Sequence, residues 1–276
     1  MRTCRVCGSH AGTANTGIVS NGHGLHECCN CGTTLVEEVD WDELPNVYDE
    51  LFEHGGYEQH RREFQRILEG KAGTDVYRRW LFGRTAGRVG AGRVVEIGGG
   101  TGTFGYWLTS KGWRYKNFDL SDSAVHFCHR LGLEAEVIKP KDLSPLSSES
   151  ANVLVMWEVL EHVWNVHEYL KAIRRGLETH GIVILSTPNY LRSGYTQNLI
   201  RSGPSLSSPP IHVNFFTLRS LRTTLEAAGF SIRSAFGRRL NRPPAWKADA
   251  LANRIRILLR LEEPRELYAI AEARDA

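Results

Sequence analysis

Four of the six cysteines in this 276-residue chain are paired at a spacing that binds metal. Two residues separate the members of each pair, twenty residues separate the pairs, and the four thiols are Cys4, Cys7, Cys28 and Cys31. Four thiolates complete the tetrahedral shell of Zn²⁺ and leave no open position, so we expect a structural zinc site rather than a catalytic one. A segment of about forty residues has too little core to fold alone, and bound zinc would supply much of its stability.

A second group of chemically useful residues is a glycine-rich turn. A short β-branched run ends in Glu96 and leads into Gly98, Gly100 and Gly102, where the absence of side chains lets the backbone approach a ligand closely. With Gly105 these residues also match the dinucleotide pattern G-x-G-x-x-G, which is a weak signal by itself. A pyrophosphate prefers a helix N-terminus without a neighbouring anion, so the carboxylate of Glu96 favours a cationic ligand instead.

A third group combines carboxylates with imidazoles. Glu158, Glu161 and His162 lie close together in the sequence, and His212 comes from a later loop. Two carboxylates and two imidazoles suit Mg²⁺, Mn²⁺ or Zn²⁺. Alternatively, a histidine acts as a general base without metal. In a third interpretation none of the four acts, Glu161 caps a helix and His162 is a packed side chain.

The elements that must position these residues form an alternating pattern of strands and helices. Apolar and β-branched runs predict strands at 94–97, 114–119, 133–138, 153–156, 181–186, 230–236 and 266–271. Helical periodicity predicts helices at 103–110, 122–131, 166–177, 218–228 and 245–261, and two more within 49–89. This order predicts an α/β fold, a Rossmann-like seven-stranded sheet with helices on both faces. Ligands bind such sheets at the carboxyl ends of the strands.

Asp119 ends the second predicted strand, seventeen residues after Gly102. An acid at this place accepts hydrogen bonds from ribose hydroxyls. The alternative role, the N-cap of the next helix, is better filled by Ser121 or Asp122. Asp119 therefore supports an adenosine-containing ligand.

The glycine turn and its surroundings resemble a known family. The pattern E-x-G-x-G-x-G at Glu96–Gly102 resembles motif I of class I S-adenosylmethionine (SAM) methyltransferases. The run from about 90 to 275 resembles their ubiquinone-type and sugar-type members, through E-V-L-E-H-V, T-P-N and H-x-N-F-F-T. The resemblance implies SAM at the turn, Asp142 and Leu143 as adenine contacts, and Trp157 where substrate meets cofactor.

The string E-x-x-E-H with a distant histidine resembles the metal set of small-RNA 2′-O-methyltransferases and ubiquinone-pathway O-methyltransferases. In those enzymes the set holds a divalent cation that clamps neighbouring hydroxyls. The resemblance therefore implies that Glu158, Glu161, His162 and His212 bind such a cation. An N-terminal zinc ribbon before this domain resembles methyltransferases of deoxysugar, polysaccharide and antibiotic pathways.

Three functions follow. The first is O-methylation of a small hydroxylated molecule such as a sugar, a nucleotide-sugar or a natural-product intermediate. The second is an RNA methyltransferase whose ribbon docks on RNA. The net charge of +3 does not favour it, and neither do the two fixed cations of residues 1–36, Arg2 and Arg5. The third is a SAM-binding interaction protein without turnover.

We expect a zinc ribbon at 1–40, a helical linker or lid at 41–89, and the methyltransferase domain at 90–276. The lid interpretation places Tyr48 or Tyr57 facing SAM. The loop 190–210 is expected to cover the substrate, with Arg192 and Arg201 as possible contacts to an anionic group. Because the sequence lacks membrane-length apolar runs and a signal-peptide core, we expect a cytoplasmic protein.

Overall fold

The computed structural model describes residues 3–37, 58–71, 76–87, 92–191, 195, 199, 207–238 and 264–274. The chain divides into two compact units, each made of several segments. The first, here called the ribbon unit, consists of residues 1–39, 158–171 and 185–274. The second, here called the glycine-turn unit, consists of residues 40–157, 172–184 and 275–276. The expected division into 1–40, 41–89 and 90–276 stays a prediction.

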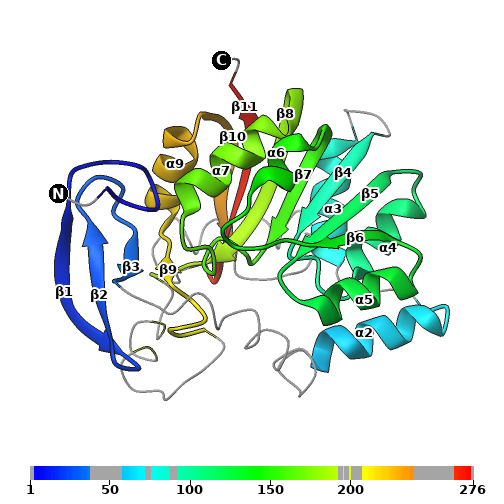
Figure 1. Cartoon of the computed structure of the whole chain (residues 1–276), viewed down its shortest axis with the longest axis horizontal. Helices are drawn as coiled ribbons and strands as arrows, with labels where there is room; N and C mark the ends of the chain where they lie inside the picture. Colours follow the sequence, from blue (N-terminus) through cyan, green and yellow to red (C-terminus); the bar gives the residue numbers. More distant parts are fainter. Residues whose placement is uncertain are drawn as a thin grey trace, which may run out of the picture. The chain divides into compact units, whose positions relative to one another are not determined.

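A seven-stranded sheet has the strand order β10-β11-β8-β7-β4-β5-β6 (Figure 1). Its strands are β4 Arg93–Ile97, β5 Arg114–Asp119, β6 Glu134–Val137, β7 Ala151–Trp157, β8 Leu177–Pro188, β10 Phe230–Arg238 and β11 Glu266–Ala273. β4 pairs in parallel with both β5 and β7, β5 pairs in parallel with β6, and β10 pairs antiparallel with β11. The predicted seven-stranded α/β fold is confirmed. β7 is almost wholly buried, as its uninterrupted apolar sequence predicts.

The helices connect these strands. They are α2 Glu58–Leu68, α3 Val76–Ala86, α4 Thr103–Thr109, α5 Asp122–Arg130, α6 Ser144–Ser148, α7 Val166–Arg175 and α9 Leu218–Ala227. Ser121 caps α5, because its side chain accepts a hydrogen bond from the Ala124 amide. Thr217 and Ser220 form a reciprocal capping box at the start of α9. Among these described helices, none is long and apolar enough to cross a membrane.

A separate four-stranded antiparallel sheet belongs to the ribbon unit (Figure 1). Three strands come from the N-terminal segment: β1 Thr13–Ser20, β2 His23–Cys28 and β3 Thr34–Val36. The fourth, β9 Asn214–Phe215, pairs with β3 and comes from much later in the chain. The N-terminal segment and the short strand that begins two residues after His212 are thus parts of one sheet, an arrangement that the cysteine spacing did not predict.

Candidate active site

The glycine turn follows β4 in the glycine-turn unit. Gly98, Gly100 and Gly102 have φ values of 69°, 55° and 72°, in the left-handed region that favours glycine. At Gly102 a Cβ would also lie 2.8 Å from the Cys128 sulfur. Both conformation and packing therefore require glycine there. The chain then enters α4 at Thr103.

Two side chains from β5 hold this turn. The Gly100 amide donates to Asp119 Oδ2 at 2.9 Å, and the Ser121 amide donates to Asp119 Oδ1 at 3.1 Å. The Gly99 amide donates to Asn117 Oδ1, also at 2.9 Å. The turn is therefore fixed by the end of the neighbouring strand, with a carboxylate beside it where the sequence predicts the ribose acceptor.

Glu96 is the acidic residue that begins the turn, and it is only 2% exposed. The Tyr115 hydroxyl donates to its Oε2 at 2.5 Å. Burial, with the charges of Asp119 and Glu96, raises the pKa of the Cys128 thiol to about 12. The negative field of two carboxylates therefore acts at the turn, which disfavours a pyrophosphate and suits a cationic ligand such as a sulfonium.

Trp157 ends β7 and packs against the start of α4. Its ring meets that of Phe104 edge-on, with 5.6 Å between centroids, and the Arg78 guanidinium lies 5.4 Å from the indole. Within the described residues, the buried atoms Trp157 Nε1 and Thr101 Oγ1 have no hydrogen-bond partner. Unsatisfied buried polar atoms are uncommon in folded proteins. Their place beside the turn fits a ligand-binding surface.

Asp142 and Leu143, the residues expected at the adenine, follow β6. Asp142 is exposed, and its Oδ1 accepts hydrogen bonds from the amide and the hydroxyl of Ser144, at 3.0 Å and 2.6 Å. These bonds lower the pKa of the Asp142 carboxyl. Leu143 is the N-cap residue of α6. Both residues therefore shape the start of α6, and their contact with adenine stays a prediction.

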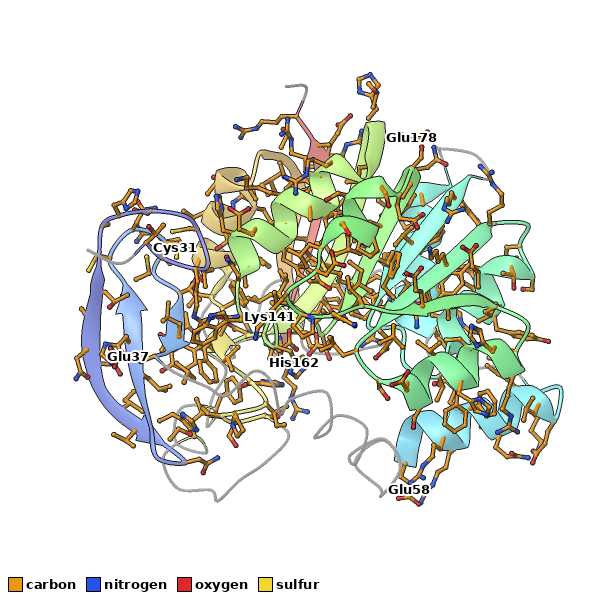
Figure 2. The ribbon with its side chains drawn as sticks, viewed as in Figure 1. Cys31, Glu37, Glu58, Lys141, His162 and Glu178 are labelled. Carbon is orange, nitrogen blue, oxygen red and sulfur yellow. The ribbon has the colours of Figure 1, made fainter. Side chains whose placement is uncertain are left out.

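In the ribbon unit, three of the four predicted carboxylate and imidazole residues come together. One ligand atom from each of Glu161, His162 and His212 lies within 4.8 Å of the others. His162 Nε2 is 4.0 Å from Glu161 Oε1. The rings of His162 and His212 are nearly perpendicular, with 4.6 Å between their centroids. Figure 2 labels His162, which lies on the segment after β7. We call these three residues the triad.

Each imidazole of the triad is held from its Nδ1 side. His162 Nδ1 is 2.8 Å from the Ile211 carbonyl, which only accepts, so this nitrogen carries the proton. His212 Nδ1 is 3.0 Å from the Tyr195 hydroxyl oxygen; because this hydroxyl donates its one proton to the Ser207 carbonyl, at 3.2 Å, its oxygen accepts the proton of His212 Nδ1. In both rings the lone pair is therefore on Nε2, the tautomer that can bind a cation.

The other groups of the triad are equally fixed. The Thr187 hydroxyl donates to Glu161 Oε2 at 2.9 Å, and Glu161 is 1% exposed. Burial lowers the pKa of His162 to about 4, against the weaker opposing effect of its bond to the Ile211 carbonyl. A neutral imidazole of low basicity is a ready metal ligand and a weak general base at neutral pH.

Glu158, the fourth predicted member, is not in the group that the structure brings within 4.8 Å. It is in the left-handed region, with φ of 58°, directly after β7. Its Oε1 accepts a hydrogen bond from the Ser186 hydroxyl at 2.8 Å, and its amide donates to the Ser186 carbonyl. These contacts fix the segment that leads to Glu161.

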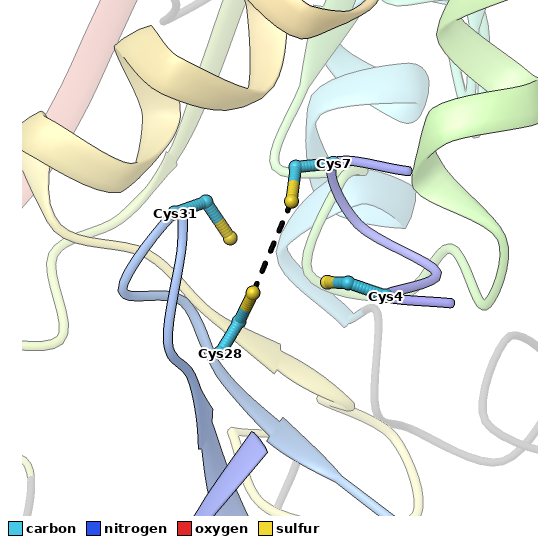
Figure 3. A group of neighbouring side chains, drawn as sticks. All are labelled: Cys4, Cys7, Cys28 and Cys31. Atoms are coloured by element: carbon cyan, nitrogen blue, oxygen red, sulfur yellow. Dashed lines mark hydrogen bonds between the residues drawn. The ribbon is translucent and has the colours of Figure 1, made fainter. Parts of the chain in front are cut away.

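The four paired cysteines converge in the same unit, as Figure 3 shows. Their sulfur atoms lie within 4.8 Å of one another, and Cys7 Sγ is 3.9 Å from Cys28 Sγ. A tetrahedron with zinc–sulfur bonds of about 2.3 Å has edges of about 3.8 Å, so the cluster fits zinc. The hydrogen bond between Cys4 and Cys31 lowers the pKa of Cys4 to about 5 and raises that of Cys31, so in the metal-free cluster Cys4 is the thiol of this pair that ionises first.

The first cysteine pair lies against the start of α7. Gly8 has φ of 73°, and a Cβ there would lie 2.6 Å from His167 Nε2. The His167 amide donates to the Arg5 carbonyl at 3.0 Å. Only glycine permits this close approach of the cysteine loop to the helix.

Several residues of these sites were not predicted. Asn117 and Tyr115 support the turn, and Thr187, Tyr195 and Asn214 support the triad. Thr187 and Asn214 lie within the strings T-P-N and H-x-N, a usable signal, whereas nothing local marks Tyr195. Some predictions fall outside the described residues: Tyr48, Tyr57, Arg192, Arg201 and the helix at 245–261.

Comparison with known proteins adds the family. A family model described as "Methyltransferase domain" matches residues 52–235. The "Probable S-adenosylmethionine-dependent methyltransferase" of Mycolicibacterium smegmatis is 28% identical over 166 residues, which cover 59% of each chain. A ubiquinone biosynthesis O-methyltransferase of Rickettsia bellii is 24% identical over 111 residues, 39% of this chain and 46% of that protein. The chain thus spans about half the length of the curated relatives it matches.

Solved structures share the fold. A SAM-dependent methyltransferase from Mesorhizobium loti has a TM-score of 0.51 at 18% identity, covering 66% of this chain and 91% of that one. A chain of the complex between the Haloferax volcanii Trm112 methyltransferase activator and a methyltransferase has a TM-score of 0.57 at 16% identity, covering 83% and 98%. Together with the glycine turn and its flanking carboxylates, the family match identifies the chain as a member of the methyltransferase-domain family, and its fold is that of class I SAM-dependent methyltransferases.

Proposed function

We propose that this enzyme methylates a hydroxyl oxygen of a small molecule, and that the triad Glu161, His162 and His212 binds a divalent cation that engages this hydroxyl. The observation that carries the proposal is that all three side chains are held in place close to one another. Each has a ligand atom within 4.8 Å of the others, and each is held from behind by a hydrogen bond. Such supporting bonds are typical of metal ligands.

The groups for the methyl donor are on the glycine turn. The backbone of Gly98–Gly102 would receive the cofactor, and Asp119 would accept hydrogen bonds from its ribose. When bound, SAM supplies a methyl group on a sulfonium, an excellent leaving group. The field of Glu96 and Asp119 stabilises a positively charged ligand at the turn.

The groups for the acceptor are on the triad. A divalent cation held there would polarise a hydroxyl and lower its pKa. Thr187 holds the Glu161 carboxylate, while the Ile211 carbonyl and Tyr195 keep both imidazoles in the Nε2 ligand form. The low pKa of His162, about 4, favours a metal ligand over a lone general base. The similarity to a Rickettsia bellii ubiquinone biosynthesis O-methyltransferase agrees with a hydroxylated acceptor.

The test is SAM turnover with a panel of sugars, nucleotide-sugars and catechols. We expect activity that EDTA abolishes and Mg²⁺ or Mn²⁺ restores, with the zinc content of the Cys4 cluster measured throughout. Glu161→Gln and His212→Ala should lose at least about 100-fold in kcat/KM, whereas Glu226→Gln, on the exposed side of α9, should not. Activity that resists EDTA and persists in both Glu161→Gln and His212→Ala would refute the proposal that the triad binds a catalytic cation.

A further inference from the structure

Arg5 lies between Cys4 and Cys7, and its guanidinium contacts both the N-terminal segment and segments from much later in the chain. Nη1 donates to the Trp164 carbonyl at 2.8 Å and to Asn214 Oδ1 at 2.6 Å. Nη2 donates to the carbonyls of Val36 and Val213, at 2.9 Å and 3.0 Å. The guanidinium also lies 3.8 Å from the centre of the Trp164 ring. One side chain therefore joins three separate segments of the ribbon unit.

Asn214, which accepts a hydrogen bond from Arg5, is also bonded to the segment that contains Glu161 and His162. Its Nδ2 donates to the carbonyls of Leu160 and Val163, at 2.9 Å and 2.6 Å, on either side of Glu161 and His162. The amides of Val213 and Asn214 both donate to the Glu161 carbonyl, at 2.8 Å and 3.1 Å. The segment with two triad residues is thereby bonded to the segment that follows His212.

The N-terminal hairpin holds the other side of the His212 loop. Asn21, at the turn between β1 and β2, donates to Ser208 Oγ at 2.8 Å and to the Pro209 carbonyl at 3.0 Å. The Ser208 carbonyl in turn accepts from the amides of Ile211 and His212, both at 3.0 Å. Ile211 supplies the carbonyl that fixes the His162 tautomer. The loop is therefore bonded to the N-terminal segment both before and after His212.

We infer that Arg5 is a positioning residue, through which the Cys4 cluster sets the relative placement of Glu161, His162 and His212. All four acceptors of its guanidinium are neutral oxygens. Four thiolates around Zn²⁺ retain net negative charge, which would stabilise the partly buried guanidinium next to Cys4. The zinc ribbon is then a structural part of the acceptor site rather than a docking module. The inference rests on the proposed function in one respect, namely that the triad serves the acceptor.

The test compares Arg5→Lys and Arg5→Gln with Arg219→Lys, a control on the exposed side of α9. Lysine keeps the charge and loses the planar fork that reaches four oxygens. We expect zinc content and the Kd for SAM to stay at wild-type values in all variants. In both Arg5 variants, amide exchange at Val213 and Asn214 should be at least about tenfold faster. Mn²⁺ affinity at the triad should fall about 10- to 100-fold.

The ring-nitrogen NMR signals of His162 and His212 provide a readout that needs no bound cation. Mixed tautomers in the Arg5 variants, with a single Nδ1–H form in wild type and Arg219→Lys, support the inference. Wild-type exchange and a single tautomer in the zinc-loaded Arg5 variants overturn it, whatever the activity. If instead His212→Ala leaves turnover unchanged, the proposed function fails, and the exchange and tautomer results still decide the role of Arg5.

Discussion

Tyr195→Phe removes one hydroxyl and should weaken cation binding at the triad. In the structure this hydroxyl accepts from His212 Nδ1 at 3.0 Å and donates to the Ser207 carbonyl at 3.2 Å. Without it, His212 loses the partner that keeps its lone pair on Nε2. One neutral hydrogen bond contributes about 0.5–1.5 kcal/mol, and loss of a bond behind a metal ligand costs about 10- to 100-fold in affinity. The two ranges overlap near tenfold, or about 1.4 kcal/mol.

The assay is Mn²⁺ titration of zinc-loaded protein, followed by calorimetry or by the electron paramagnetic resonance of free Mn²⁺. Tyr106→Phe is the matched control, because Tyr106 is 43% exposed and belongs to the glycine-turn unit. The expected result is a Kd for Mn²⁺ about tenfold higher for Tyr195→Phe and unchanged for the control, with SAM binding equal in both. A Kd within twofold of wild type, in a variant of unchanged melting temperature, would show that Tyr195 does not orient His212.

Further predictions concern the turn, the ribbon and proton binding. Asp119→Asn should raise the Kd for SAM at least about tenfold, because a charge-assisted bond contributes about 1.5–3 kcal/mol; calorimetry with an unchanged Kd would contradict this role. Gly105→Ala places a Cβ 2.2 Å from the Tyr115 ring and should cost about 1–3 kcal/mol by denaturant unfolding, whereas Gly83→Ala, in open space, should not destabilise. Metal analysis should find one zinc per chain in the wild-type protein and a lower zinc content in Cys31→Ser. Equal zinc contents in the wild type and the variant would exclude a four-thiolate site. In cation-free protein, NMR should show His162 neutral down to about pH 5, because burial lowers its pKa to about 4. The free energy of unfolding should fall as the pH falls from 6.5 toward 4, since in this range His162 takes up a proton only in the unfolded chain. Protonation of His162 in the folded protein near pH 6.5 would contradict this effect of burial.

Much of the sheet could be predicted from the sequence because each strand carries its own local signal. The buried run before Trp157 and the glycine turn after Ile97 are defined by short-range chemistry, which fixes conformation almost regardless of context. The four cysteines have a similarly local spacing rule. The glycine turn and the convergence of the four cysteines were therefore predicted residue by residue, and zinc at the cluster stays a prediction.

The supports of the triad could not be predicted in this way. Arg5, Tyr195 and Asn214 act through hydrogen bonds to residues far along the chain, and no periodic pattern records such contacts. The separation of Glu158 from the triad has the same origin, because the left-handed conformation of a non-glycine residue depends on its surroundings. The sequence named four candidate ligands, and tertiary structure determined that three of them converge.

The pairing of β3 with β9 has a consequence for synthesis of the protein. Thr34 pairs with Phe215, 181 residues further along the chain. On the ribosome, both cysteine pairs emerge well before β9 and can take up zinc at that point, whereas one edge of β3 has no partner until Phe215 is synthesised. An unpaired strand edge is prone to pair with other chains. Zinc binding before β9 is made would thus reduce the number of alternative conformations open to the N-terminal segment. In zinc-starved cells, misassembled protein should therefore accumulate before inactive folded enzyme does.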